Sequence, residues 1–317
     1  MTLPGYNHKF GQQIMTDAEG VDIDRAFLAH YHIPAASAPA ASSDGVHAAM
    51  NLGAAVQAIT TGITNPAVPR NIRIDGNVSG ITGKVKITGT DFAGAVITEE
   101  IQANGTTAVD GTLAFKTVTK IDLPIQNHTP AAQTETIQVT QGCSTAGNLT
   151  VAVTAAALGA DSPVSVTVPV TTDDDTAAEV ATKIAAGLNA DDKIKAVFAA
   201  TVTGTGNDTI TLTAKAPAAN DTTLAMALTA GTTGVTVGSS TAGTTGVPYD
   251  QISVGWGDKF GIPYKLYADE LVILKLFNKA KETTEGTITA DATDLAKNVY
   301  DPHDTTLGVD IDLYIIV

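Results

Sequence analysis

The sequence predicts a mainly β protein with a small α+β insertion. We expect an antiparallel β-sandwich or barrel-like body that an inserted domain splits, plus an extended N-terminal arm. Period-two alternation of apolar and polar residues, typical of strands with one exposed face, begins near residue 71. Residues 131–246 contain a single aromatic residue, Phe198, whereas aromatic residues are frequent on both sides of them. The first 62 residues show no sustained period.

Residues 1–62 are expected to form the N-terminal arm and linker. The stretch "HIPAASAPAASSDG" (32–45) is rich in Pro, Ala and Ser, a composition typical of extended linkers. Such a segment cannot bury enough apolar surface by itself to form a core. We therefore expect either an arm that laces along neighbouring molecules or a flexible terminus.

Residues 63–130 together with 247–317 are expected to form the β-rich body. Its strands are predicted where apolar and polar residues alternate, at 71–74, 84–89, 95–101, 115–123, 269–277 and 308–317. The segment "GTDFAG" (89–94) has the composition of a hairpin loop. "NPAVPR" (65–70) contains two prolines and predicts a rigid entry to the first strand.

Residues 131–246 are expected to form an inserted α+β module. Thr/Val-rich runs predict strands, and one helix is predicted over 176–190. Thr176 and Glu179 have the spacing of a capping box, and the acidic run Asp173–Asp175 precedes the helix, where its dipole favours negative charge. We prefer this capping role to a calcium site, because the EF-hand pattern is not met.

The acidic composition limits the partners of the chain. Its 317 residues carry a formal net charge of −15 at pH 7, with only 16% charged residues. An acidic surface repels phosphate backbones and anionic lipids, so we expect no direct nucleic-acid binding and no membrane binding. The N-terminus has no basic region followed by an apolar core, so we expect no signal peptide.

One stretch, "SVGWGDKFGIPYKL" (253–266), has glycines near the spacing of a phosphate-binding loop. Phe260 stands where the dinucleotide fingerprint requires its third glycine, and Pro263 disfavours an ordinary helix start. We therefore predict a strand kinked by Gly255 and Gly257, a turn at "GDKFG" and a second strand entered through Pro263. Its anchors in a core or an interface are the glycines and the aromatic residues of the stretch: Trp256, Phe260, Gly255, Gly257 and Tyr264.

Other chemistry-bearing residues stand in the sequence without the partners that a catalytic or metal site requires. His30 and His32 flank Tyr31 and would point the same way in an extended chain, but no partner stands at a recognised spacing, so a solvated pair is expected. Asp301, His303 and Asp304 gather in one loop without a nucleophile motif.

Cys143, the only cysteine, has no histidine nearby in the sequence and is expected to be structural or incidental. A single cysteine also excludes an intrachain disulfide. We therefore expect no catalytic residue, no metal site and no cofactor.

Several segments of the body resemble a group of tailed-bacteriophage virion proteins. They are "TTGITNPAVPRNIRIDGN", "GTDFAGAVITEEIQANGTTAVDGTLAFKTVTKIDLP" and "ISVGWGDKFGIPYKLYADE". Their shared pattern is a proline-rich lead-in to β-hairpins, an "AFKTV-x-x-I-x-LP" strand and a "VG-x-GDK-x-G-(I/L)-PY" segment. The inserted module, with "DTAAEVATKIAAGLNAD", is similar to Thr/Ala-rich modules of phage head and tail proteins. The first 45 residues lie outside the resemblance, which transfers no catalytic residue.

The resemblance implies a structural virion protein of the head decoration or head-fibre type. Such a protein would be made in the host cytoplasm and would lie on the outer capsid surface. Its partners would be the major capsid protein and copies of itself, in a homo-oligomer such as a trimer. A tail tube or tail-fibre component is the alternative. A carbohydrate-acting hydrolase on a β-scaffold is a second alternative; against it, carboxylates such as Glu99, Glu100 and Asp269 lie on alternating strands without a surrounding aromatic platform for sugar.

Overall fold

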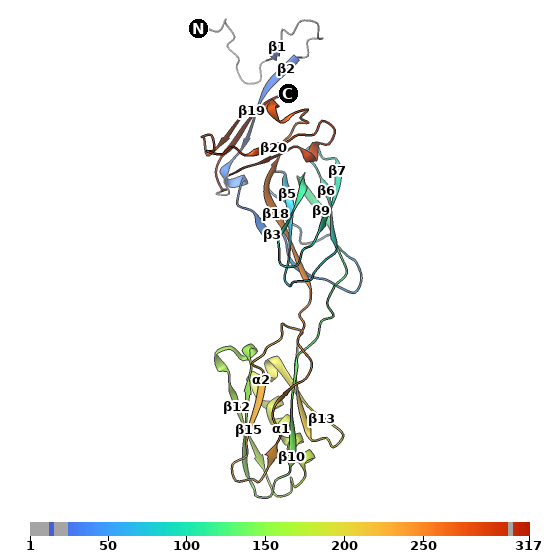
Figure 1. Ribbon diagram of the computed structural model, residues 1–317, viewed down its shortest axis with the longest axis vertical. Coiled ribbons are helices and arrows are strands. Elements are labelled where there is room, and N and C mark those ends of the chain that lie inside the picture. Colours follow the sequence, from blue (N-terminus) through green and yellow to red (C-terminus); the bar gives the residue numbers. More distant parts are fainter. Residues whose placement is uncertain (1–12, 16–24, 304–306) are drawn as a thin grey trace. The chain divides into compact units, whose positions relative to one another are not determined.

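The computed structural model describes residues 13–15, 25–303 and 307–317. The chain folds into two compact units, of which unit 1 comprises residues 1–127 and 250–317 and unit 2 comprises residues 128–249. Each unit is built mainly from antiparallel strands (Figure 1). This confirms the expectation of a mainly β fold with few helices. In the described part of the chain, no helix has both the length and the apolar character needed to span a bilayer.

Unit 1 contains two antiparallel sheets that contribute to one core. The first has the order β20–β21–β18–β5–β8, and β3 also pairs with β18. The second has the order β4–β9–β6–β7. The strands of the first sheet are β3 (Ser42–Asn51), β5 (Arg70–Gly76), β8 (Val109–Phe115), β18 (Gln251–Gly261), β20 (Thr287–Thr289) and β21 (Val299–Asp301). Those of the second are β4 (Gln57–Ile59), β6 (Lys84–Thr90), β7 (Val96–Gln102) and β9 (Thr117–Leu123).

The inward-facing apolar residues of these two sheets form the first core of unit 1. Ile72 and Ile74 of β5 and Val254 of β18 belong to the same buried cluster as Ile87 of β6 and Ile121 of β9. Along β6, buried residues alternate with exposed or half-buried ones, as the period-two pattern predicts. The expected hairpin is also present, because β6 and β7 pair from Lys84↔Gln102 to Thr90↔Val96.

The two sheets are joined along one side by the chain itself and by a side chain. Only Lys116 separates β8 from β9, so the chain passes directly from one sheet to the other. Glu99 of β7 then reaches β8, where its carboxylate accepts hydrogen bonds from the backbone N–H of Thr112 at 2.6 Å and of Leu113 at 3.3 Å. The body is therefore closed on this side in the manner of a half-barrel.

A third sheet of unit 1 has its own core. Its order is β1–β2–β22–β19, from β1 (Gln13–Met15), β2 (Arg25–Ile33), β19 (Val272–Phe277) and β22 (Ile311–Ile316). Ile33, Phe277 and Leu313 are buried in a cluster that also includes Phe260 and Tyr300 of the first sheet. Strand β22 lies inside this sheet, between β2 and β19.

Strand β18 connects the two cores of unit 1, and it corrects one prediction. Ile252 and Val254 lie in the first core, whereas Phe260 lies in the second. The strand runs without a break to Gly261, so the turn expected at "GDKFG" is wrong, as is the second strand expected after Pro263. The expected kink is present as shifts of register against β3 and β5 on either side of Trp256.

The expectation of an irregular arm over residues 1–62 is wrong for the residues from 25 onward that the structure describes. Strand β2 pairs with β22, β3 pairs with β18 and β4 pairs with β9. Val46 and Met50 of β3 belong to the first core. These segments are stabilised by partners more than 60 residues away along the chain, which local composition does not reveal. Residues 1–12 and 16–24 of the expected arm lie outside the described residues.

Unit 2 contains two antiparallel sheets, two α-helices and a 3₁₀ helix, Ala156–Asp161. One sheet has the order β13–β14–β10–β16, with β17 also paired to β10, and the other has the order β12–β11–β15. The helices are α1 (Ala177–Ala190) and α2 (Asp192–Val197). The strands are β10 (Thr134–Gln141), β11 (Gly147–Thr154), β12 (Val164–Val170), β13 (Phe198–Thr203), β14 (Thr209–Ala214), β15 (Ala225–Thr229), β16 (Thr236–Val237) and β17 (Thr241–Ala242).

Helix α1 confirms the predicted helix and its capping box. The Thr176 side chain accepts a hydrogen bond from the Glu179 N–H, and the Glu179 carboxylate accepts one from the Thr176 N–H at 3.1 Å. The buried face of the helix, which includes Val180, Ile184 and Leu188, packs into the core of unit 2. Asp174 accepts bonds from the Thr171 N–H and the Lys183 ammonium, both at 2.7 Å, so this aspartate organises the helix entry.

The two ends of unit 2 lie beside each other. Ala131 and Val247 exchange backbone hydrogen bonds of 2.9 Å in both directions. On the unit 1 side, the Asn127 N–H donates to the Asp250 carboxylate at 2.6 Å. The chain therefore leaves and re-enters unit 1 at one place. The expected insertion, residues 131–246, lies inside unit 2.

Candidate functional site

The glycines of the stretch "SVGWGDKFG" allow β18 to approach the neighbouring strands β3 and β5 closely. A Cβ atom placed on Gly255 would lie 1.7 Å from the Ser42 carbonyl oxygen of β3. A Cβ atom on Gly257 would lie 2.2 Å from the amide nitrogen of Asn71 on β5. Neither position has room for a side chain, so packing in the sheet explains both glycines without a bound phosphate.

The three aromatic residues proposed as anchors differ in burial. Phe260 is fully buried in the second core, and Tyr264 is half-buried against that core. Trp256 is half-buried at the edge of the first core, and its indole N–H donates to the Ala40 carbonyl at 3.3 Å. Its ring covers Gly45, where an added Cβ would come within 2.6 Å of the indole. Trp256 therefore fixes the path of β3.

Arg70 is a buried cation between these anchors. Its side chain is 1% exposed, and the guanidinium carbon lies 4.6 Å from the centre of the Phe260 ring. The guanidinium donates to the carbonyls of Pro39, at 2.7 Å, and Gly257. Burial lowers the pKa of Arg70 to about 10, so the group keeps its charge at neutral pH. Arg70 thus ties β18 to the segment that precedes β3.

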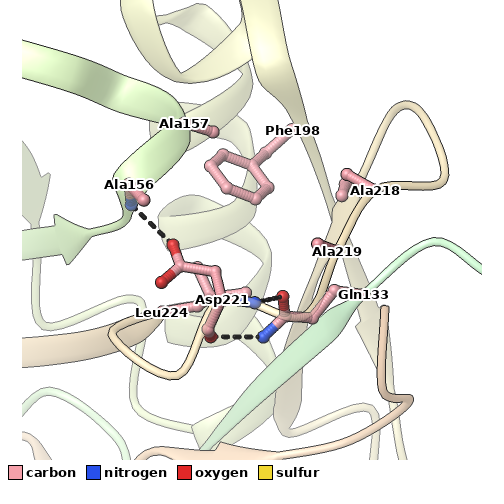
Figure 2. A pocket seen from close by; sticks show the side chains of 9 residues that line it. Gln133, Ala156, Ala157, Phe198, Ala218, Ala219, Asp221 and Leu224 are labelled. Atoms are coloured by element: carbon pink, nitrogen blue, oxygen red, sulfur yellow. Dashed lines mark hydrogen bonds between the residues drawn. The ribbon is translucent and has the colours of Figure 1, made fainter. Parts of the chain in front are cut away.

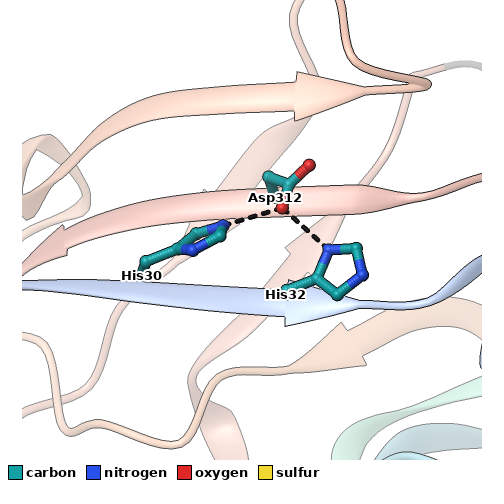
Figure 3. Close-up of side chains that lie close together, drawn as sticks. All are labelled: His30, His32 and Asp312. Carbon is teal, nitrogen blue, oxygen red and sulfur yellow. Dashed lines mark hydrogen bonds and ion pairs between the residues drawn. The ribbon is translucent and has the colours of Figure 1, made fainter. Parts of the chain in front are cut away.

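His30, His32 and Asp312 form a cluster on the third sheet (Figure 3). The Asp312 Oδ1 atom lies 2.7 Å from His30 Nε2 and 2.8 Å from His32 Nδ1. The histidines come from β2 and the aspartate from β22. The prediction that they point the same way is confirmed, but the expected solvated pair is wrong, because both rings contact one carboxylate.

Neighbouring groups hold this cluster in place. The His30 ring stacks on the Tyr314 ring at a centroid distance of 4.6 Å and an interplanar angle of 7°. Partial burial acts to raise the pKa of Asp312, but the hydrogen bonds from His30 and His32 lower it below the ordinary value. Asp312 is therefore a carboxylate at neutral pH.

The loop that joins Asp301, His303 and Asp304 in the sequence is only partly described, because Asp304 lies outside the described residues. Asp301 ends β21, and its carboxylate lies 3.4 Å from the Lys259 ammonium. Burial raises the pKa of Asp301. The ion pair gives this carboxylate a structural partner within unit 1.

Unit 2 contains an apolar pocket of about 290 Å³ (Figure 2). Phe198 and Leu224 contribute to its lining, together with several alanines. Its polar groups are engaged with each other: the Asp221 carboxylate accepts from the Ala156 N–H at 2.5 Å, and the Gln133 side chain pairs with the Asp221 backbone through two bonds of 2.7 Å. These bonds stabilise the pocket wall and leave it mainly apolar.

The carboxylates named for the hydrolase alternative, those of Glu99, Glu100 and Asp269, each have a different environment. Glu99 is bonded to β8, as described above, whereas Glu100 forms an ion pair of 2.8 Å with Lys84. Asp269 lies in a short 3₁₀ helix, Asp269–Leu271. Cys143 is buried, and its thiol donates to the Thr145 carbonyl at 3.1 Å. The three carboxylates therefore have separate surroundings and do not form an acid pair around a common position.

Sequence reasoning missed one residue of the histidine cluster. Alternation in "GVDIDLYIIV" places Asp312 on the face opposite Ile311 and Leu313, which is a signal for an outward carboxylate. The signal does not identify its neighbour, because β2 and β22 are separated by most of the chain.

A scan against protein-family models gives no match, and a search among curated proteins gives no significant match.

Proposed function

We propose that the chain is a structural protein of a tailed-bacteriophage particle that decorates and reinforces the outer surface of the capsid. It would contact the major capsid protein and copies of itself, and it would act without catalysis. One observation carries the proposal: the segments that resemble phage virion proteins make up the framework of unit 1. "AFKTV" spans the passage from β8 to β9, and "VGWGDKFG" lies in β18, which connects both cores.

The position of these segments favours a shared architecture over a chance likeness. Residues of these segments are required by the packing of unit 1: Gly257 allows β18 to approach Asn71 closely, and Phe260 is fully buried. Residues of this kind specify a scaffold. We therefore extend the sequence resemblance from the scaffold to the role by analogy.

The charge of the chain is compatible with the outside of a filled capsid. A formal net charge of −15 opposes contact with packaged DNA, whose backbone is a dense array of negative charges. Like charge also keeps a protein soluble at high concentration until it meets its specific partner. Both properties suit a component that is added to the outer surface.

Tyr267 is a candidate contact residue for the capsid. It lies in the segment that carries the resemblance, yet its side chain is 85% exposed and is not part of a core of unit 1. Tyrosine is enriched among the residues that dominate protein–protein binding energy. Tyr249 in unit 2, at 42% exposure, offers a matched control.

A reconstitution experiment tests the proposal. Purified chain is mixed with phage particles that lack it, and the particles are sedimented. We expect saturable binding, which Tyr267→Ser weakens and Tyr249→Ser leaves unchanged. Failure to bind the heads, or assembly of the pure chain into long tubes, would contradict the decoration role, and tubes would favour the tail-tube alternative.

A further inference from the structure

We propose that His30, His32 and Asp312 bind a divalent transition-metal ion, with zinc as the first candidate. This site would connect strand β2 to the C-terminal strand β22. The inference is independent of the proposed role in a phage particle, since it depends only on the geometry and chemistry of the three side chains.

The backbone brings the three ligands to one face of the third sheet. His32 pairs directly with Asp312 across β2 and β22, and His30 pairs with Tyr314 two residues along. Residues two apart in a strand point to the same face, so both histidines lie beside the aspartate. The pairing of the strands fixes this arrangement through six consecutive residue pairs, from Leu28↔Ile316 to Ile33↔Ile311.

The ligand atoms are close to the spacing that a metal ion requires. One atom from each residue lies within 4.8 Å of the other two, and Asp312 Oδ1 is 2.7 Å and 2.8 Å from the two ring nitrogens. Tetrahedral zinc with bonds of about 2.0–2.2 Å separates its ligand atoms by roughly 3.4 Å. Small rotations of the carboxylate and the two rings would reach that separation, with the ion replacing the hydrogen bonds that now join the two ring nitrogens to the carboxylate (Figure 3).

The donor set selects the class of metal. Two imidazole nitrogens and one carboxylate oxygen suit zinc, copper, nickel or cobalt, whereas magnesium and calcium prefer oxygen ligands alone. Three protein ligands leave at least one position for water or for another donor. Such a site is open, in contrast to the closed four-ligand sites that zinc occupies in small structural domains.

The site is accessible and partly preorganised. The side chains of His30 and His32 are 35% and 43% exposed, so an ion can reach them without opening the core. The carboxylate is only 14% exposed, and the stacking of His30 on Tyr314 restricts that ring. Ligands held in place before binding lose less conformational freedom when the ion arrives.

A bound ion would stabilise the third sheet. Ligands that bind only the folded state shift the unfolding equilibrium toward that state. Because His32 and Asp312 are 280 residues apart in the sequence, the ion would join two distant segments of the chain. The thermal midpoint of unit 1 is therefore expected to rise when zinc is added.

The test uses the full chain without a histidine tag. Zinc chloride is titrated by calorimetry, and cobalt chloride is titrated by visible absorption, since the spectrum of cobalt reports its ligands. The variants are His30→Gln, His32→Gln and Asp312→Asn. His47→Gln is the matched control, because His47 is a half-buried histidine of β3 whose ring contacts the Ala48 carbonyl and lies outside the cluster.

The expected result is one ion per chain, with an affinity that each cluster variant lowers by about tenfold or more and that His47→Gln leaves unchanged. Unfolding curves recorded without metal establish that each variant is folded. Absence of binding by the folded wild-type chain would overturn the proposal. So would equal affinity in the wild type and the folded cluster variants, because the ion would then bind elsewhere.

Discussion

Substitution of Gly257 by alanine tests the explanation of the glycine-rich stretch. The added Cβ would lie 2.2 Å from Asn71 Nδ2 and 2.4 Å from Asn71 Oδ1, far inside van der Waals contact. Asn71 is fully buried, so its side chain has no solvent to move into. Its Oδ1 accepts from the Lys259 N–H at 3.0 Å, and its Nδ2 donates to the Gly111 carbonyl at 3.3 Å. The substitution therefore displaces a bonded, buried amide.

The expected loss of stability follows from these two hydrogen bonds. Leaving a buried polar group unpaired costs about 1–3 kcal/mol, and the displaced amide leaves partners on both β18 and β8. We expect Gly257→Ala to lower the free energy of unfolding of unit 1 by about 2–4 kcal/mol. Backbone strain adds nothing here, because Gly257 is not among the glycines with positive φ.

The assay is urea unfolding followed by tryptophan fluorescence. Trp256 is the only tryptophan of the chain and lies in unit 1, so its signal reports on that unit. Gly238→Ala in unit 2 is the control, because a Cβ there meets only the Gln138 carbonyl oxygen, at 3.9 Å. This control should leave the fluorescence transition unchanged.

A double-mutant cycle identifies the cause of the loss. If the clash with Asn71 is responsible, Gly257→Ala should cost little in a chain that already carries Asn71→Ala. Additive effects of the two substitutions would refute the reasoning. A Gly257→Ala chain as stable as the wild type would refute it as well.

Three further predictions concern other parts of the fold. Replacing residues 128–249 by a short Gly/Ser linker should leave unit 1 with a cooperative unfolding transition, since Asn127 and Asp250, which the linker would join, are already in contact. Loss of the cooperative transition in the shortened chain would contradict the independence of unit 1. Phe260→Ala should destabilise unit 1 by about 3–5 kcal/mol in the same urea assay, and a loss below about 1 kcal/mol would contradict its core position. Burial acts to raise the pKa of Asp174, but bonds from Lys183 and Thr171 lower it below 3.8. The stability that Asp174 provides is therefore fully present above its ordinary pKa and is lost as the pH falls through the lowered pKa of the folded chain. Asp174→Asn should flatten the acid limb of the unfolding of unit 2, measured by its helical circular-dichroism signal; parallel curves for the variant and the wild type would contradict this.

Local patterns predicted the elements whose partners are close in sequence. The β6–β7 hairpin follows from alternation on both sides of "GTDFAG", and α1 follows from the Thr176–Glu179 capping box and its apolar face. In these cases, local preference and tertiary packing favour the same structure. The sequence alone was sufficient because little long-range information was needed.

Elements that depend on distant partners were not predictable. Strand β3 has the sequence "SSDGVHAAMN", which contains few strand-favouring residues and is stabilised by β18, some 200 residues later. The end of β18 was expected to turn, because Gly257, Asp258 and Gly261 are typical turn residues. Their role became visible only with the side chain of Asn71 and the chain of β5 beside them.

The histidine cluster shows the same limit for the candidate site. The spacing of His30 and His32 predicted that both rings share a face of a strand, and the structure confirms it. The third residue, Asp312, lies 280 positions away from His32 and could not be paired with it from one sequence. Strand order in the third sheet was the missing information.

The measurement that tests the proposed function most directly is electron cryomicroscopy of purified phage particles with and without the chain. We expect additional density on the outer surface of the head, into which unit 1 fits, and the loss of this density from particles that lack the chain. Density confined to the tail, or identical heads in the two samples, would contradict the proposed decoration role.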